Sequence, residues 1–321
     1  MSTTEVAADA VRTGAPPPAE RRQSPMGRRG MSEAWRRRLP LLPALIFVIV
    51  LTQLPFLGTL VVSFMNWNSY YPEDRGFTGF SNYARVFTDV NARSAVFVTI
   101  VLTVSVVLIC LVLGLLIALL LDRKFPGRGV VRTMMITPFL LVPIAAALLW
   151  KHALYNPEYG LFNGLLTVFL GDNAPQPDWV GSMPLPALIA AISWQWTPFM
   201  MLILLAGLQS RPLDVVEAAR IDGASSWQIF IHMTLPHLRP YIELSTLLGT
   251  IYVVQNFDHV FTITAGATGS ANLPYFVYQT FYTAQDYGRA SAAGVVTVAG
   301  TLIVSMLALR TVFTVFQQES R

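Results

Sequence analysis

Six long apolar segments dominate this sequence and limit what the chain can fold into. A helix needs about 20 mostly apolar residues to cross roughly 30 Å of hydrocarbon. Segments of this kind lie at about residues 40–65, 95–121, 133–150, 185–208, 241–264 and 290–316. With 54% hydrophobic and 12% charged residues, the chain has more apolar surface than one soluble core can bury. An all-α polytopic membrane protein with six transmembrane helices is predicted, because helices satisfy their own backbone hydrogen bonds in lipid.

Lysine and arginine lie mostly on one side of these segments. Cytoplasmic loops of membrane proteins carry an excess of basic residues. The tail at 1–38, the connection at 123–132 and the polar loop at 209–240 hold most of the 22 Lys and Arg residues. We therefore expect both termini and the 209–240 loop in the cytoplasm. The basic tail lacks the periodicity of a folded domain, so we expect it to be disordered and residues 39–321 to form the membrane domain.

The polar loop between the fourth and fifth apolar segments has the pattern of two short helices joined by a sharp turn. Gly223 can adopt the left-handed conformation that ends a helix. Ser225 and Gln228 have the spacing of a capping box for the second helix. Pro236 and Pro240 should limit how far this second helix continues into the next span. The pattern predicts a rigid elbow.

Side chains of the same loop suit contact with another protein. Ala218 and Ala219 are small enough for a partner surface to approach the backbone closely. Trp227, Phe230 and Ile231 lie at helical spacing and offer an apolar anchor. The alternative interpretation is an amphipathic loop that lies on the membrane surface.

The loop resembles the cytoplasmic coupling loop of type I ABC importer permeases, including their EAA motif. The residues that carry the resemblance are Glu217, Ala218, Ala219, Asp222, Gly223, Ala224, Phe230, Leu235, Pro236 and Pro240. From about residue 40 to the end, the chain is similar to carbohydrate permeases of the maltose-permease type, for example at Trp196 and the run at 205–209. The stretch at 272–282, NLPYFVYQTFY, looks more like the sorbitol and mannitol permeases.

This resemblance implies a type I ABC importer transmembrane-domain fold in the bacterial plasma (inner) membrane. It implies a permease subunit of a binding-protein-dependent importer that takes up a sugar or sugar alcohol. ATP and Mg would be bound by separate ATPase subunits, and this chain would bind no cofactor. The implied partners are a second homologous permease subunit, two ATP-binding subunits, an extracytoplasmic solute-binding protein, the lipid bilayer and a small polyhydroxylated solute, with no nucleic acid. The coupling loop at 209–240 would transmit closure of the ATPase dimer to the membrane helices.

Polar and aromatic side chains in the fourth and fifth segments are candidates for the substrate path. The candidates are Trp194, Trp196, Tyr252, Gln255, Asn256, Asp258 and His259. Tyr252, Asn256 and His259 recur at i, i+4 and i+7, so we expect them on one helical face. Polar groups inside a span usually face a cavity or the bundle interior, and sugars need donors, acceptors and aromatic faces. The alternative is that these side chains only pack the helices together.

Two other classes of function remain as alternatives. An ion-coupled secondary transporter of a small polar solute could use Asp258, but such carriers usually contain internal repeats, and no duplicated halves are apparent. A membrane enzyme would need convergent catalytic groups, whereas Asp258 and His259 are neighbours that point in different directions on a helix. The sequence contains no pattern typical of a metal cluster, an activated nucleophile or a phosphate-binding loop, and its single cysteine, Cys110, cannot form a disulfide within the chain. We therefore predict a non-catalytic transport subunit.

Overall fold

The computed structural model of the protein describes residues 39–171 and 173–318. The prediction of a disordered tail at 1–38 falls outside the described residues. The chain divides into two compact units, Met1–Pro55 and Phe56–Arg321.

The described part of the first unit is helical and apolar. A 3₁₀ turn, η1 (Leu39–Leu41), leads into α3 (Leu42–Ser63), which continues past Pro55 into the second unit. Large apolar side chains of α3, such as Leu45 and Phe47, are exposed. Such a surface is unfavourable in water, but it is what a helix in contact with lipid presents.

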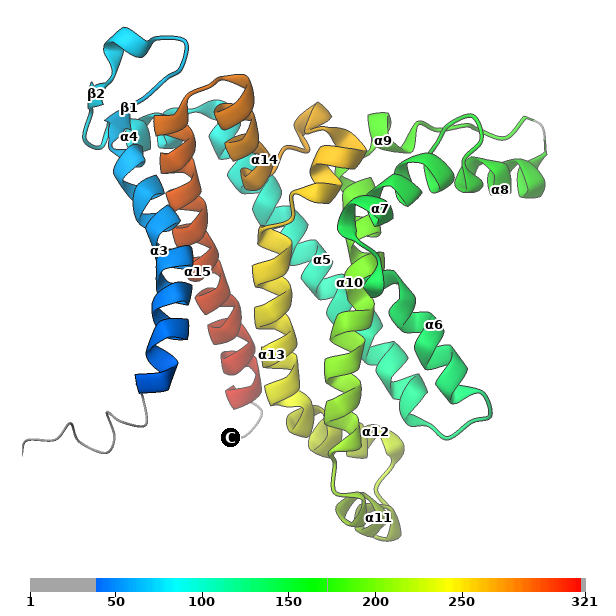
Figure 1. Ribbon diagram of the computed structural model, residues 1–321. Helices are drawn as coiled ribbons and strands as arrows, with labels where there is room; N and C mark the ends of the chain where they lie inside the picture. The colour runs from blue at the N-terminus through cyan, green and yellow to red at the C-terminus, as the bar shows by residue number, and fades with distance from the viewer. Residues whose placement is uncertain (1–38, 172, 319–321) are drawn as a thin grey trace, which may run out of the picture. The chain divides into compact units, whose positions relative to one another are not determined.

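Four long helices form the centre of the second unit (Figure 1). They are α5 (Val90–Asp122), α10 (Pro184–Gln209), α13 (Leu235–Val254) and α15 (Tyr287–Gln318). Helix α5 packs along α10, and α13 packs against α5, α10 and α15. At Gly114 a Cβ atom would lie 3.0 Å from the backbone nitrogen of Met201, so α5 and α10 approach closely there. Small residues permit this kind of packing between membrane helices.

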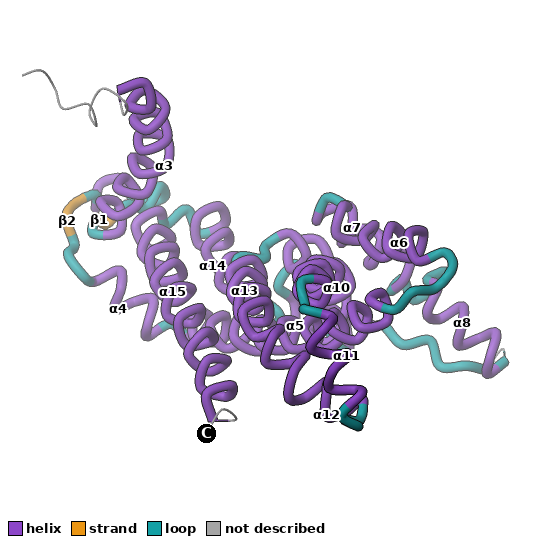
Figure 2. The backbone as a smooth tube through the Cα atoms, turned by 90° about the horizontal axis from the view of Figure 1, so that it is seen from below, coloured by secondary structure: helices purple, strands orange, loops and turns teal. Residues whose placement is uncertain are grey.

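Shorter elements connect these helices and cap the bundle. Between α3 and α10 they are β1 (Met65–Asn66), η2 (Pro72–Asp74), β2 (Gly76–Phe77), α4 (Ser81–Thr88), α6 (Arg128–Leu140), α7 (Pro143–Leu148), η3 (Leu149–Leu154), α8 (Leu161–Leu170) and α9 (Trp179–Ser182). After α10 they are α11 (Leu213–Ile221), α12 (Ser226–Ile229), η4 (Phe230–Thr234), η5 (Val260–Thr264), η6 (Ala267–Gly269), α14 (Leu273–Tyr278) and η7 (Gln279–Thr283). The strands β1 and β2, orange in Figure 2, pair antiparallel with Met65 opposite Phe77.

The third apolar segment is a bent pair of helices. Helix α6 ends at Leu140, and α7 begins at Pro143 and continues through the π-helical turn η3 to Leu154, with a bend of 97° between the two arms. Proline suits the first turn of a helix because its missing N–H needs no partner there. The break therefore coincides with Pro143, whereas Pro138 lies inside α6.

The fifth segment differs from the expected continuous helix at 241–264. Helix α13 begins earlier, at Leu235, and ends at Val254. The chain then leaves the helix at residues 255–257, and the π-helical turn η5 follows at Val260. The side-chain amide of Asn272 donates to the carbonyl of Asn256 at 2.5 Å, which satisfies a backbone group that the break leaves outside a helix.

The number of membrane-spanning helices is only partly as predicted. Among the described residues, four helices are long and apolar enough to cross a membrane: α3, α5, α10 and the portion of α15 at Tyr287–Leu307. The bent pair formed by α6 with α7 and η3 is a fifth candidate. Helix α13 has 20 residues, but His237, Arg239 and Glu243 near its start make it less apolar. The all-helical architecture agrees with the prediction, while the count of six is not confirmed.

Candidate functional site

The elbow between α10 and α13 is closed by its own backbone hydrogen bonds. At the end of α11, Gly223 has φ +87°, in the left-handed region that favours glycine. The N–H of Ala224 bonds to the carbonyl of Ala219 at 2.9 Å, and that of Gly223 bonds to Arg220 at 3.1 Å. These two bonds make a Schellman motif. The sharp turn predicted at Gly223 is confirmed.

The second helix of the elbow begins with the predicted capping box. The hydroxyl of Ser225 accepts from the N–H of Gln228 at 3.3 Å, and the side-chain oxygen of Gln228 accepts from the N–H of Ser225 at 2.8 Å. Both bonds satisfy backbone donors that the first turn of a helix leaves free. The elbow therefore has defined geometry on both sides of Gly223.

The prolines after the elbow do not stop its second helix, so this prediction was wrong. Helical backbone continues from α12 through the π-helical turn η4 into α13. The N–H of Leu235 bonds to the carbonyl of Phe230 across this wider turn. Pro236 lies in the first turn of α13, directly after the π-helical turn η4, and Pro240 lies further inside the helix.

The elbow presents an aromatic and apolar surface. The Trp227 side chain is 68% exposed and stacks on Phe230, with 5.8 Å between ring centroids. Ile221 and Leu213 of α11 are also exposed. Among the other predicted coupling residues, Glu217, Ala218, Asp222, Gly223 and Pro236 are exposed, and Ala219, Ala224 and Leu235 are partly buried. Exposed apolar groups of this kind mark interaction surfaces.

An ionic clamp holds the base of the elbow to α5. Arg211 Nη2 lies 3.0 Å from Asp122 Oδ2 at the end of α5, and Arg211 Nη1 donates to Thr234 Oγ1 at 2.7 Å. The side chains of Arg211 and Asp122 are largely buried. The clamp therefore holds Arg211 both to α5, through Asp122, and to η4, through Thr234. The positions of these residues in the sequence did not predict this contact.

A second group of contacts joins the end of α10 to the start of α13. The hydroxyl of Ser210 donates to the carbonyl of Gly207 at 2.9 Å and lies 2.9 Å from the Tyr241 hydroxyl. His237 Nε2 lies 3.1 Å from the same carbonyl, to which it can donate. Polar contacts next to the elbow therefore connect α10 and α13, the two helices that carry it.

The candidates for the substrate path do not form a single cluster. Trp196 of α10 stacks on Tyr252 of α13, with 4.8 Å between ring centroids. The ring centroid of Phe139 on α6 lies 5.6 Å from that of Trp196 and 5.2 Å from that of Phe199. We call Phe139, Trp196, Phe199 and Tyr252 the aromatic face. Tyr252 is 49% exposed and the other three are partly buried. Phe139 and Phe199 were not predicted, although Phe199 follows Trp196 at helical spacing.

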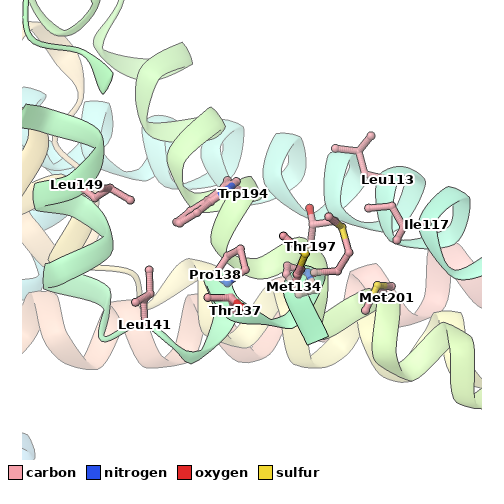
Figure 3. A pocket seen from close by; sticks show the side chains of 12 residues that line it. Leu113, Ile117, Met134, Thr137, Pro138, Leu141, Leu149, Trp194, Thr197 and Met201 are labelled. Carbon is pink, nitrogen blue, oxygen red and sulfur yellow. The ribbon is translucent and has the colours of Figure 1, made fainter. Parts of the chain in front are cut away.

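Trp194 lies apart from the aromatic face. Its ring packs against Trp150, with 5.8 Å between ring centroids. The Trp194 side chain also lines a cavity between α6 and α10 (Figure 3). Gln195 lies between Trp194 and Trp196 in the sequence. Its side-chain amide donates to the carbonyl of Leu141 at 2.9 Å, at the bend between α6 and α7. Gln195 thus satisfies a backbone group at one helix break, as Asn272 does at the other.

The polar residues of the fifth segment gather around the break after α13. Asn256 Nδ2 lies 3.2 Å from Nδ1 of the fully buried His259. Gln255 is exposed in the turn, and Asp258 is partly buried at the start of the next helical turn. Because the helix ends at Val254, the expectation that Tyr252, Asn256 and His259 share one helical face is wrong.

Comparison with known proteins assigns the family. Residues 110–318 match the family described as "Binding-protein-dependent transport system inner membrane component". The chain belongs to this family. The permease is also 35% identical over 276 residues to the trehalose/maltose transport system permease protein MalF of Thermococcus litoralis, which covers 85% of this chain and 92% of the relative. It is 34% identical to the probable ABC transporter permease protein y4oQ of Sinorhizobium fredii, with 82% of this chain and 85% of the relative covered.

A solved structure supports the fold of the permease. One chain of a bacterial alginate ABC transporter, solved in complex with an alginate pentasaccharide-bound periplasmic protein, matches with a TM-score of 0.74. The sequences are 20% identical, and the match covers 86% of this chain and 93% of the other. The predicted ABC importer transmembrane-domain fold of a multi-pass membrane protein is confirmed. The suggested link to polyol permeases remains a prediction.

Polar side chains at helix breaks and exposed aromatic side chains are the main chemical features of the permease. Within residues 39–171 and 173–318, no group of three or more His, Cys, Asp or Glu side chains could hold a metal ion. The features described above are amides at helix breaks, aromatic rings and an exposed elbow. These groups can orient a polar solute and contact a partner protein.

The ionic clamp of the permease leads to a first prediction. Replacing Arg211 with glutamine should lower the free energy of unfolding by about 1–2 kcal/mol, because Asp122 loses its charged partner while it remains mostly buried. Thermal unfolding of Arg211→Gln, Asp122→Asn and the double variant would give the coupling energy. A coupling energy close to zero would contradict the clamp.

Proposed function

We propose that this permease is the membrane subunit of an ATP-driven importer that takes up a sugar or sugar alcohol. The observation that carries the proposal is the rigid elbow with Trp227 exposed at its surface. The transporter contains two separate ATP-binding subunits that hold the ATP and Mg, and one of them docks on this elbow, so this chain is non-catalytic and binds no cofactor. A second homologous permease subunit and an extracytoplasmic solute-binding protein complete the transporter. The chain lies in the bacterial plasma membrane with both termini in the cytoplasm.

The aromatic face supports a polyhydroxylated solute as the substrate. Sugars bind through hydrogen bonds from their hydroxyls and through contact of their C–H faces with aromatic rings. The exposed Tyr252 and the stacked Trp196 offer such a ring surface, and Gln255 and Asn256 provide amides nearby in sequence. The related permease of Thermococcus litoralis belongs to a trehalose/maltose system, which favours the same class of substrate.

The proposed transport cycle uses the elbow as the contact with the ATPase. The loaded binding protein docks on the outer loops, and ATP closes the dimer of nucleotide-binding subunits. Closure of this dimer moves the elbow. The elbow in turn moves α10 and α13, and the substrate path opens to the outside. Hydrolysis of ATP then restores the inward-facing state and releases the solute into the cell.

Uptake by proteoliposomes tests this proposal. Vesicles that contain this chain with its candidate permease, ATPase and binding-protein partners are screened with radiolabelled hexitols, monosaccharides and disaccharides. ATP-dependent uptake of one of these solutes supports the proposal, and uptake of a hexitol also supports the polyol prediction. Uptake that follows an ion gradient without ATP would establish the secondary-transporter alternative instead.

The aromatic face gives a second prediction. Trp196→Leu should lower the rate of ATP-dependent uptake by about two- to tenfold, since a stacked aromatic contact contributes about 0.5–1.5 kcal/mol. Trp194→Leu removes the same kind of side chain two residues away, from a ring that packs on Trp150. It should leave the uptake rate within about twofold of the wild type. Initial rates at equal membrane levels of the variants measure both effects, and an equal loss in the two variants would count against the aromatic face.

Gly223 gives a third prediction. Gly223→Asp should reduce uptake at least about tenfold, because a left-handed residue other than glycine costs about 1–2 kcal/mol and the new carboxylate enters the docking surface. A Cβ atom at this position meets no atom within 4 Å, so the variant should still accumulate in the membrane. Gly127 is in the left-handed conformation with φ +82° and has equally open surroundings at the start of α6, and Gly127→Asp is the matched control. Normal uptake by a well-expressed Gly223→Asp protein would refute coupling through the elbow.

A further inference from the structure

Two adjacent apolar cavities lie beside α5 and α6. The first has a volume of about 630 Å³ and extends between α5, α6 and α10 (Figure 3). The second has a volume of about 520 Å³ and reaches the end of α5. Ile117 and Met135 line both cavities, so the two are adjacent. We call the combined cavity the α5–α6 groove, which runs from Leu149 and Trp194 to Phe125.

The wall of the groove suits a hydrocarbon chain and not a sugar. Most of its side chains are Leu, Ile, Met and Pro. The hydroxyl of Thr137 donates to the carbonyl of Thr133 at 3.2 Å, and that of Thr197 donates to Ser193 at 2.7 Å. Both hydroxyls are therefore used by their own helices. A polyhydroxylated solute would lose its hydrogen bonds to water here without replacing them, which is unfavourable.

One end of the groove is positively charged. Arg123 and Lys124 line this end and are exposed. In the part of the chain that the structure describes, neither side chain forms an ion pair. The neighbouring carboxylate of Asp122 is already paired with Arg211. Two cations with no neutralising partner beside an apolar cavity can bind an anionic group, and basic pockets between membrane helices bind lipid headgroups in this way.

The charged end lies at the boundary of the apolar part of α5. Leu120 and Leu121 are the last apolar residues before Asp122, Arg123 and Lys124. Through the contact between Asp122 and Arg211, this boundary is on the same side of the bundle as the elbow. The cations therefore lie at headgroup depth, and the groove extends from them toward the bilayer centre. The assignment of this side to the cytoplasmic leaflet rests on the proposed function.

We propose that the α5–α6 groove binds an anionic glycerophospholipid, with its phosphate on Arg123 and Lys124 and one acyl chain along Ile117 and Met135. The headgroup meets complementary charge, and the acyl chain meets a wall that has no free hydrogen-bonding hydroxyl. A bound lipid fills the space between α5 and α6 next to the clamp that holds the elbow. The lipid is a structural ligand of the permease and is distinct from the transported solute.

Native mass spectrometry of the full-length permease tests this assignment. The probes are phosphatidylglycerol and phosphatidylcholine with identical acyl chains, each titrated into the delipidated protein. Phosphatidylglycerol should bind at least about tenfold more tightly, and Arg123→Ala/Lys124→Ala should weaken it about 30-fold. The control Arg85→Ala/Arg93→Ala removes two exposed charges, one on α4 and one at the start of α5, and should leave binding unchanged. Met135→Trp fills the groove without a change of charge and should weaken both lipids about tenfold.

Several results would overturn the proposal. Equal affinity for the two lipids, or equal loss in the two double variants, would show that the cations do not form a specific site. Unchanged binding in Met135→Trp would show that the groove holds no acyl chain. Release of phosphatidylglycerol when the second permease subunit binds would assign the groove to that subunit. Since binding is measured without ATP or solute, these results are independent of whether the protein is an importer.

Discussion

Replacing Trp227 with alanine should weaken the binding of the ATPase subunit by about 30-fold or more. The indole is 68% exposed on the elbow and is held in place by stacking on Phe230. An exposed, preorganised tryptophan is the kind of residue that contributes most to a protein interface, and its truncation costs about 2 kcal/mol or more. The affinity of the purified permease complex for the ATPase subunit, measured by surface-based binding or calorimetry, gives the effect directly. ATP-dependent uptake should fall with it.

The matched control for Trp227 is another exposed aromatic side chain. Phe169 of α8 is 80% exposed and lies far from the elbow in the sequence. Phe169→Ala should change the affinity for the ATPase subunit by less than about twofold. Trp227→Phe should retain most of the affinity if the aromatic surface is what matters. Tight ATPase binding by Trp227→Ala would show that the elbow docks through other residues.

A leucine at Gly207 should destabilise the permease by about 3 kcal/mol. Gly207 is buried in α10, where a Cβ atom would lie 2.6 Å from Tyr241 Cδ2 and 2.8 Å from Leu238 Cδ2 on α13. The larger side chain would force α10 and α13 apart, and overpacking of this kind costs about 1–3 kcal/mol or more. It would also disturb the polar contacts of Ser210 above the elbow. We expect a lower thermal unfolding midpoint and a loss of coupled uptake.

Gly300 in α15 provides the comparison for Gly207. It is also a helical glycine, but a Cβ atom there meets no atom within 4 Å. Gly300→Leu should therefore leave the unfolding midpoint unchanged or raise it, because leucine has about 1 kcal/mol better helix propensity than glycine. Fluorescence-detected unfolding in detergent compares the two variants. A similar midpoint for both would mean that α10 and α13 are not closely packed at Gly207.

Local patterns in the sequence were enough to predict the elbow. Gly223, Ser225 and Gln228 act through residues within five positions of each other, so their spacing alone specifies the turn and the cap. The apolar segments likewise predicted the helical membrane architecture, because length and apolarity are properties of each segment by itself. The prolines misled the prediction, since a π-helical turn at η4 lets the helix continue past Pro236.

Features that depend on distant residues could not be predicted in this way. The break after Val254 is stabilised by Asn272 from another element, and the clamp joins Arg211 to Asp122 across 89 positions of the chain. The aromatic face likewise needs Phe139 from α6 beside Trp196 from α10. Each contact depends on how helices pack, which no single segment encodes. The roles assigned to the substrate-path residues remain predictions.

The uninterrupted helical backbone from Ser226 to Val254 has a mechanical consequence. At about 1.5 Å per residue, it spans about 40 Å, with Trp227 near one end and Tyr252 near the other. Its ladder of hydrogen bonds is incomplete, because Pro236 and Pro240 have no N–H to donate and the turn at η4 is π-helical. The segment therefore bends most easily at residues 230–240, between the two aromatic side chains. A movement applied at Trp227 is divided there between bending of the helix and displacement of the Tyr252 ring.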